Sequence, residues 1–178
     1  MNNIIEPTCV QGRYRDSTMR CSDCIAGKYQ TGINLLVCTN CPVGKASSKS
    51  KALHCTMCNP GEYQDEEQGT FCKRCEAGRY SNATNASSSD VCSECPAGKW
   101  SLQGLSKCDT CPAGRSSNNT GLTSGDDCTP VPAGKFSNAS GNAEHCDKGW
   151  YQDEAGKTFC KLCAAGNLTR VIYFHVLF

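Results

Sequence analysis

The amino-acid sequence predicts a small, disulfide-rich fold: a linear array of about ten short, irregular or β-hairpin cysteine-rich modules with almost no helix. We expect each module to touch only its neighbours in this array. Three observations predict this class. Cysteine supplies 17 of the 178 residues, a share typical of disulfide scaffolds. Leu, Ile, Val and Phe together supply only 26 residues, too few to build a conventional single core. A cysteine doublet followed by a glycine recurs along the chain, which indicates a repeat protein.

The doublets have the form C-x2-C and define the modules. There are seven of them: Cys21/Cys24, Cys38/Cys41, Cys55/Cys58, Cys72/Cys75, Cys92/Cys95, Cys108/Cys111 and Cys160/Cys163. If the second cysteine of each doublet begins a module, the modules begin at residues 9, 24, 41, 58, 75, 95, 111, 131, 146 and 163. The sequence thus predicts an N-terminal segment (1–8), a repeat array (9–168) and an apolar tail (169–178).

Every module has a glycine three residues after its start, and this position predicts a turn with positive φ. Prolines before that glycine in four modules favour the same turn. An aromatic residue follows the glycine by two positions in seven modules, and we expect it to cover a disulfide. These aromatics are Tyr14, Tyr29, Tyr63, Tyr80, Trp100, Phe136 and Tyr151.

One module lacks both of its cysteines, because Val131 and Ala143 occupy their positions. Loss of both leaves no orphan thiol only if the two ends of a module pair with each other. The predicted pairs are Cys9–Cys21, Cys24–Cys38, Cys41–Cys55, Cys58–Cys72, Cys75–Cys92, Cys95–Cys108, Cys111–Cys128 and Cys146–Cys160, which leaves Cys163 unpaired. Each closed loop of about 15 residues contributes roughly 3 kcal/mol by chain entropy. We expect the module at 131 to be a flexible joint.

The cysteine content predicts an oxidising compartment, hence an extracellular or cell-surface protein. Five N-x-Ser/Thr sequons support this and predict N-glycosylation: Asn82, Asn85, Asn118, Asn138 and Asn167. The N-terminus has neither the basic nor the apolar part of a signal peptide. We therefore expect the chain to be a fragment, attached to a membrane only through segments outside it, with the 169–178 tail a truncated or aberrant end.

Two segments, 58–78 and 146–166, are identical at 13 of 21 positions. Their shared run C-x2-G-x-Y-Q-D-E-x5-C-K-x-C-x-A-G, together with the C-P-A-G motifs, resembles the ephrin type-A/B receptor-like cysteine-rich repeat. Its wider relatives are the tumour-necrosis-factor-receptor and growth-factor-receptor cysteine-rich modules. The resemblance covers residues 9 to about 168 and implies a disulfide-laddered ectodomain stalk, with a protein ligand in some members. No kinase signature is present, so it does not imply kinase activity.

Other chemistry finds less support in the sequence. The C-x2-C-x13-C-x2-C run at 21–41 fits zinc-ribbon spacing, but the cysteines do not divide into sets of four. The acidic pairs Asp65/Glu66 and Asp153/Glu154 lack the ligand spread of a calcium loop, so we interpret them as polar turns. The three histidines have no catalytic context. We predict no catalytic residue, no cofactor and no metal.

A basic residue follows the module glycine in seven modules: Arg13, Lys28, Lys45, Arg79, Lys99, Arg115 and Lys135. If these align, they form a column for an acidic glycan or an acidic protein, with Lys99, Arg115 and Lys135 as the candidate ligand surface. The alternative is that each is a solvated side chain whose stem covers a disulfide. The net charge of +1 and the mixed signs give no support for nucleic-acid binding.

The sequence therefore predicts a non-enzymatic extracellular or cell-surface segment that acts as a stalk and as a binding ectodomain for a protein or a glycan. One alternative is a structural spacer without its own ligand. A minor alternative is an intracellular zinc-binding repeat protein.

Overall fold

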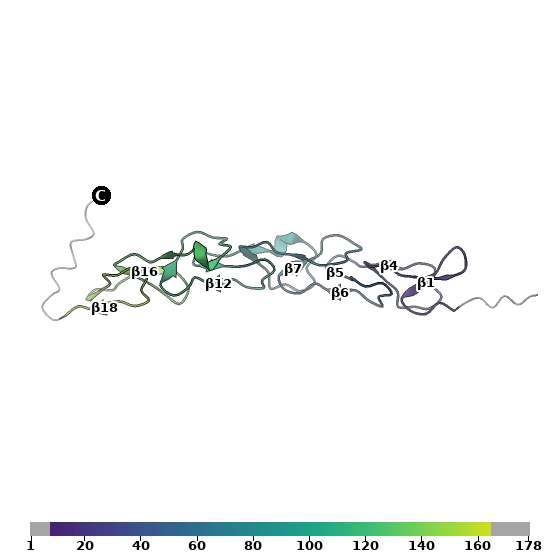
Figure 1. The fold of residues 1–178 in the computed structure, drawn as a ribbon, viewed down its shortest axis with the longest axis horizontal. Coiled ribbons are helices and arrows are strands. Elements are labelled where there is room, and N and C mark those ends of the chain that lie inside the picture. Colours follow the sequence, from purple (N-terminus) through teal and green to yellow (C-terminus); the bar gives the residue numbers. More distant parts are fainter. Residues whose placement is uncertain (1–7, 165–178) are drawn as a thin grey trace, which may run out of the picture. The chain divides into compact units, whose positions relative to one another are not determined.

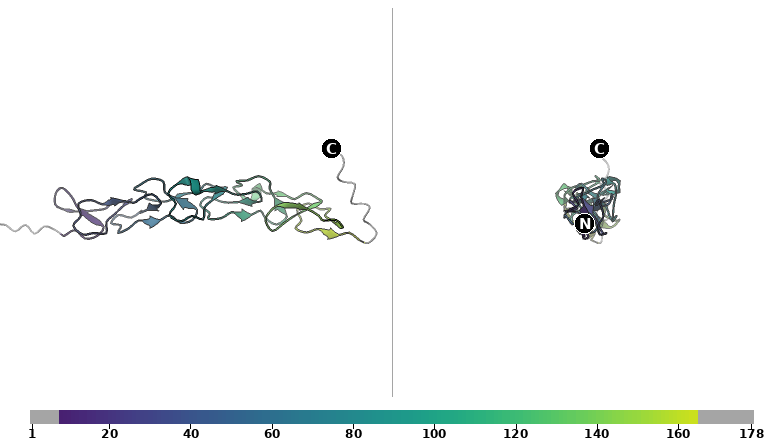
Figure 2. Two further views of the ribbon diagram at one scale, coloured as in Figure 1. Left: turned by 180° about the vertical axis from the view of Figure 1, so that it is seen from behind. Right: turned by 90° about the vertical axis from the view of Figure 1, so that its right-hand side faces the viewer.

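The computed structural model describes residues 8–164, and short antiparallel strand pairs make up most of its regular structure (Figure 1). Figure 2 gives two further views of the same ribbon. The strands are β1 (Arg13–Arg15), β2 (Cys21–Asp23), β3 (Lys28–Tyr29), β4 (Thr39–Asn40), β5 (Lys45–Ala46), β6 (Thr56–Met57), β7 (Glu62–Tyr63), β8 (Lys73–Arg74), β9 (Arg79–Tyr80), β10 (Ser93–Glu94), β11 (Lys99–Trp100), β12 (Asp109–Thr110), β13 (Arg115–Ser116), β14 (Thr129–Pro130), β15 (Lys135–Ser137), β16 (Ala143–His145), β17 (Trp150–Tyr151) and β18 (Lys161–Leu162).

Each odd-numbered strand pairs with the next strand, so one hairpin forms per module, from β1–β2 to β17–β18. The described residues contain two single-turn 3-10 helices, Ser89–Val91 and Gly125–Asp127. Both begin after a serine that accepts a hydrogen bond from the helix N-terminus, Ser88 and Ser124 respectively. The predicted fold class, a linear array of small disulfide-rich modules with almost no helix, is confirmed.

The module glycine makes the turn that the sequence predicts. In the second module, the amide of Lys28 donates to the carbonyl of Ile25 at 3.1 Å, and Gly27 has φ +80°. This is a turn with positive φ at its third residue, a position that favours glycine. The turn directs the chain into β3, and the amide of Cys41 then donates to the carbonyl of Gly27. The hairpin is closed in this way at the doublet.

The described part of the chain divides into two compact units. The first contains the described residues up to Glu76, together with Tyr80–Ser93 and Gln103–Lys107. The second contains Ala77–Arg79, Glu94–Leu102 and the described residues from Cys108 onward. Within each unit the modules are connected by the same repeated contacts.

The first of these contacts joins consecutive modules. The amide of a module glycine donates to the carbonyl six residues after the start of the next module, as Gly44 does to Gln64 at 2.7 Å and Gly78 to Ser101 at 2.8 Å. In return, the carbonyl of the module's first residue accepts from a loop amide of the next module, as Cys41 does from Gln68 at 2.8 Å. Two backbone hydrogen bonds therefore join these pairs of modules.

The second contact corrects an expectation. The sequence reasoning assumed that each module touches only its neighbours, as in a simple repeat array. Gly27 instead lies against the backbone of Gln68, two modules further on, and Gly78 lies likewise against Gly121. A glycine without a side chain lets the two backbones approach closely, so modules that are two apart also pack together. The expectation of contacts between neighbouring modules alone is wrong.

The interior consists mainly of disulfides rather than aliphatic side chains. Fully or almost fully buried cysteines include Cys9, Cys24, Cys41, Cys58, Cys75, Cys95 and Cys128. Val131, which replaces a cysteine, is also completely buried. Large apolar side chains elsewhere are often exposed, among them Phe71, Leu36 and Phe159. Cross-links, rather than a hydrophobic core, are therefore the main stabilising element, since so little apolar surface is removed from water.

Candidate functional site

The candidate site is built on the repeating unit of disulfide, turn glycine and basic residue. Eight disulfides close the modules, joining Cys9–Cys21, Cys24–Cys38, Cys41–Cys55, Cys58–Cys72, Cys75–Cys92, Cys95–Cys108, Cys111–Cys128 and Cys146–Cys160. Each bond joins the two end cysteines of a single module. Cys163 carries no disulfide within residues 8–164 and is partly buried.

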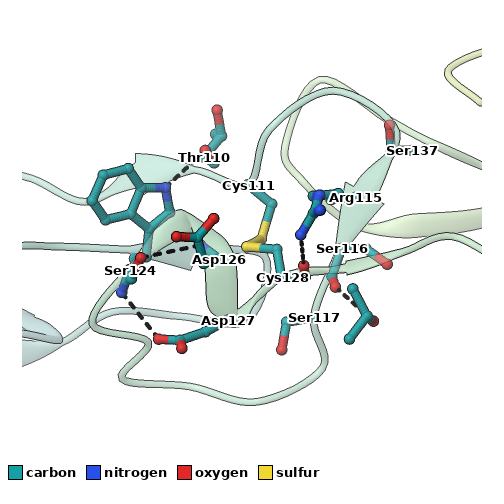
Figure 3. The surroundings of a disulfide bond; sticks show 12 residues. Thr110, Cys111, Arg115, Ser116, Ser117, Ser124, Asp126, Asp127, Cys128 and Ser137 are labelled. Atoms are coloured by element: carbon teal, nitrogen blue, oxygen red, sulfur yellow. Dashed lines mark hydrogen bonds between the residues drawn. A yellow bond between two sulfur atoms is a disulfide. The ribbon is translucent and has the colours of Figure 1, made fainter. Parts of the chain in front are cut away.

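Figure 3 shows the surroundings of the Cys111–Cys128 disulfide, against which an aromatic residue of the preceding module packs. Trp100, from the preceding module, packs against a small cluster of Cys111, Cys128 and Leu122. Its indole Nε1 donates to the carbonyl of Thr110 at 3.2 Å. The ring thus buries apolar surface against the next module while its polar edge is satisfied.

The basic residues after the module glycines do not share one environment. Arg13 Nε lies 2.7 Å from Asp23 Oδ1, its cross-strand neighbour on β2. Arg115 directs its guanidinium at its own module, where Nη1 donates to the carbonyl of Cys128 at 2.8 Å (Figure 3). These two side chains therefore bond groups of their own modules, Arg13 a carboxylate and Arg115 a carbonyl.

Lys99 and Lys135 differ from Arg115. Both are half-buried, and neither has an ion pair in the part of the chain that the structure describes. Arg115 has no ion pair there either, but its Nη1 is bonded to the carbonyl of Cys128. The two lysines are therefore the residues of the candidate ligand surface whose charged groups are not bonded to their own module. Lys28 and Lys45 are likewise half-buried, and Arg79 is exposed.

The acidic pairs form ion-pair clusters. In the module that the Cys146–Cys160 disulfide closes, Lys161 Nζ lies 2.7 Å from Asp153 Oδ1 and 2.9 Å from Glu154 Oε1. Lys157 Nζ lies 2.9 Å from Glu154 Oε2. The hydrogen bonds from Lys157 and Lys161 lower the pKa of Glu154 to about 2. The hydrogen bond from Lys161 likewise lowers the pKa of Asp153. These carboxylates are neutralised by lysines, which supports their interpretation as structural turns.

The same arrangement occurs in the related segment of the first unit. Lys73 Nζ lies 2.6 Å from Asp65 Oδ1 and 3.2 Å from Glu66 Oε1. The hydrogen bond to Asp65 raises the pKa of Lys73 and lowers the pKa of Asp65. Both segments share a lysine directly after the cysteine, in the C-K part of their common motif. This lysine is the sequence signal for the ion pairs, and the sequence analysis did not use it.

Sequence reasoning also missed three buried glutamines. Gln30, Gln64 and Gln152 follow the tyrosine of their modules, and each is at most 4% exposed. The side chain of Gln64 donates to the carbonyl of Phe71 at 2.6 Å and accepts from the amide of Glu66 at 3.1 Å. Gln152 makes the same two bonds, and so does Gln30. The signal in the sequence is the Tyr-Gln dipeptide at the same position in three modules.

The sequons lie in different surroundings. Asn82, Asn85 and Asn118 are exposed. Asn138 is half-buried, and its amide Nδ2 donates to Glu144 Oε1 at 2.6 Å while its Oδ1 accepts from the amides of Ser140 and Asn142. Asn167 and the 169–178 tail lie outside the described residues, as does nearly all of the N-terminal segment.

Other site types find no support between residues 8 and 164. No group of three or more His, Cys, Asp or Glu side chains there is arranged to hold a metal ion. In the same range, no helix has the length and apolar character needed to span a membrane.

The fold and its cross-links define the class: a disulfide-bonded, cysteine-rich repeat protein of extracellular type. The family model described as tyrosine-protein kinase ephrin type A/B receptor-like matches residues 12–54, 44–92 and 134–172. These matches cover more than half of the chain, and the chain therefore belongs to this family of ephrin receptor-like repeats, a non-catalytic type of module. No curated protein matches the chain.

Proposed function

We propose that the chain is a non-enzymatic, glycosylated stalk segment of an extracellular or cell-surface protein, with a surface on its second unit for an acidic glycan or an acidic protein. The observation that carries the stalk is the repeated backbone contact between modules. The same hydrogen bonds and the same glycine contacts recur within each unit. A stalk needs such repetition, because each module then stiffens the next two.

The stalk is tested by small-angle X-ray scattering on the oxidised chain. A compact globule of 178 residues has a radius of gyration near 16 Å by the scaling law for folded domains. We expect a value far above this, and a further increase after reduction of the disulfides. A radius of gyration near the compact value would contradict the stalk.

The binding surface rests on Lys99 and Lys135, whose charges have no ion-pair partner among the described residues. Cationic side chains at a protein surface attract polyanions, and the attraction weakens as salt screens it. The ligand is therefore proposed to carry regularly spaced sulfate or carboxylate groups.

A plain spacer without its own ligand is the second candidate function. It is favoured by Arg13 and Arg115, because their guanidinium groups are bonded to groups of their own modules. Binding measurements on a sulfated glycan separate the two candidates, and they are described as a prediction below.

A further inference from the structure

The module at 131–145 differs from its neighbours in how the chain is cross-linked. Residues 129–145 lie between Cys128 and Cys146, outside every disulfide loop. Between the other disulfide loops only two residues lie outside, as at Lys73–Arg74 between Cys72 and Cys75. A break in the chain within 129–145 therefore separates it into two pieces, whereas a break inside any closed loop leaves the pieces joined.

The module at 9–23, which the Cys9–Cys21 disulfide closes, has the same local structure as the module at 131–145 and is called its twin below. Ser137 faces Ala143 across β15 and β16 in the register in which Arg15 faces Cys21 across β1 and β2. The loop between the strands is also the same. The amide of Asn138 donates to the carbonyl of Asn142, as the amide of Asp16 does to the carbonyl of Arg20, both at 2.9 Å.

Only noncovalent contacts hold the module at 131–145 closed. Val131 is completely buried where its twin has Cys9. The amide of Ser137 donates to the carbonyl of Lys157 at 2.9 Å, and its hydroxyl accepts from the amide of Gly114 at 2.8 Å. Because no disulfide limits its opening, the whole segment can open as a local unit, which its twin cannot do.

We propose that the module at 131–145 is a proteolytic release site, cut between Lys135 and Phe136 by an endopeptidase that cleaves after basic residues. Lys135 is the only Lys or Arg in 129–145. The enzyme uses water to break the peptide C–N bond. The hydroxyl joins the carbonyl carbon of Lys135 to give a carboxylate, and the amine forms on Phe136. The products are two pieces that no disulfide joins, so the part of the chain up to Lys135 separates from the part that begins at Phe136 once the noncovalent contacts between their modules open.

The proposal is tested by limited digestion of the whole oxidised chain with trypsin, followed by non-reducing electrophoresis and mass spectrometry. The first separated pieces should end at Lys135 and begin at Phe136. The same samples after reduction report every cut, including those inside closed loops. We expect the Lys135 bond to be cut at least about tenfold faster than the bond after Lys99 or Arg115, whose modules are stapled. Equal rates, or a first cut after Lys73 or Arg74, would overturn the proposal.

A matched pair of variants tests the missing staple as the cause. Val131→Cys with Ala143→Cys recreates the pair of the twin, with the same separation of 12 residues as Cys9–Cys21. Once mass spectrometry shows that the bond has formed, cutting after Lys135, scored on reduced samples, should slow about tenfold or more. An unchanged rate in this stapled variant would refute the release site.

The reverse variant, Cys9→Val with Cys21→Ala, removes the staple from the twin. Cutting after Arg13 should then accelerate and separate the pieces without reductant. Hydrogen exchange on the unaltered chain gives a second measurement in case a variant misfolds. The Ser137 amide should exchange faster than the Ser101 amide at the equivalent position of a stapled module, and slower or equal exchange would contradict the proposal. None of these outcomes depends on glycan binding or on the radius of gyration.

Discussion

A β-carbon added at Gly27 would lie 2.2 Å from the carbonyl oxygen of Gln68. The two residues belong to modules that are two apart, and Gln68 in turn donates its amide to the carbonyl of Cys41 in the module between them. One glycine therefore lets three consecutive modules pack together. Gly134 has almost the same φ, +81°, but among residues 8–164 no atom other than those of its chain neighbours lies within 4 Å of its added β-carbon. These two glycines separate the effect of backbone conformation from the effect of packing.

We expect Gly134→Ala to cost about 1–2 kcal/mol of stability, because an L-residue is strained at positive φ. Gly27→Ala should cost a further 1–3 kcal/mol or so, because the close backbone approach must open. Hydrogen exchange under oxidising conditions measures both, through the Gln68 amide for Gly27→Ala and the Gly156 amide for Gly134→Ala. Equal costs would show that the contact between modules two apart adds nothing.

The disulfide pairing is tested by peptide mapping without reduction. We expect each module's two end cysteines to appear in one linked peptide pair, and a link from Cys24 to Cys55 would contradict the pairing. Cys95→Ser should leave Cys108 as a free thiol and loosen its own module. The loss should also reach the next two modules, since Gly121 donates to the carbonyl of Cys95 and a β-carbon at Gly98 would meet Gly141. Faster exchange of the Gly121 amide, with the Gly44 amide unchanged, is the expected result.

The buried glutamines give a prediction about polar satisfaction. Gln64→Ala leaves the carbonyl of Phe71 and the amide of Glu66 without these partners, and we expect a loss of about 1–3 kcal/mol. Gln103, which is exposed, serves as the control, and Gln103→Ala should change stability by less than about 0.5 kcal/mol. Exchange rates of the amides in β7 and β8 measure the effect of Gln64→Ala, and those of the amides in β11 and β12 measure the effect of Gln103→Ala. If Gln64→Ala leaves stability unchanged, water satisfies the carbonyl of Phe71 and the amide of Glu66 in its place.

The ion-pair clusters predict a response to acid. The pKa values of Asp65, Asp153 and Glu154 are lowered in the folded chain, so their contribution is present above the ordinary carboxyl pKa near 4. It is lost as the pH falls through the folded values, which for Glu154 means about 2. Lys161→Met should raise the pKa of Asp153 and Glu154 toward ordinary values and leave Asp65 unchanged, whereas Lys73→Met should raise only that of Asp65. Carboxyl titration by NMR measures each pKa. If the pKa values of Asp153 and Glu154 in Lys161→Met stay as low as in the unaltered chain, the cluster is contradicted.

The candidate ligand surface is tested with heparin as the polyanion. Lys99→Ser with Lys135→Ser should weaken binding several-fold at low salt, and the difference should shrink as salt rises because exposed charges are screened beyond roughly 10 Å at 0.1 M. Adding Arg115→Ser should weaken binding little further, because Arg115 bonds its own module. The thermal midpoint of the double variant should stay near that of the unaltered chain. If the unaltered chain does not bind heparin at low salt, the spacer becomes the better function.

Several features of the fold follow from short-range sequence patterns. A glycine three residues after a cysteine can be recognised as a turn position, because positive φ is nearly free only for glycine. Its nine described examples have φ between +76° and +85°. The scarcity of aliphatic residues predicts cross-links in place of a core. The paired replacement at Val131 and Ala143 identifies the one module whose ends lack cysteines, without any coordinates.

Tertiary structure alone decided which charges are available and which backbones touch. Seven basic residues occupy one sequence position, yet Arg13 and Arg115 bond their own modules while Lys99 and Lys135 have no ion pair among the described residues. The contact of Gly27 with Gln68 also could not be predicted from the sequence. A repeat of residue types fixes local turns, because these depend on φ and on neighbouring side chains. The rotation from one module to the next depends on how whole backbones pack, and that packing determines which distant residues meet.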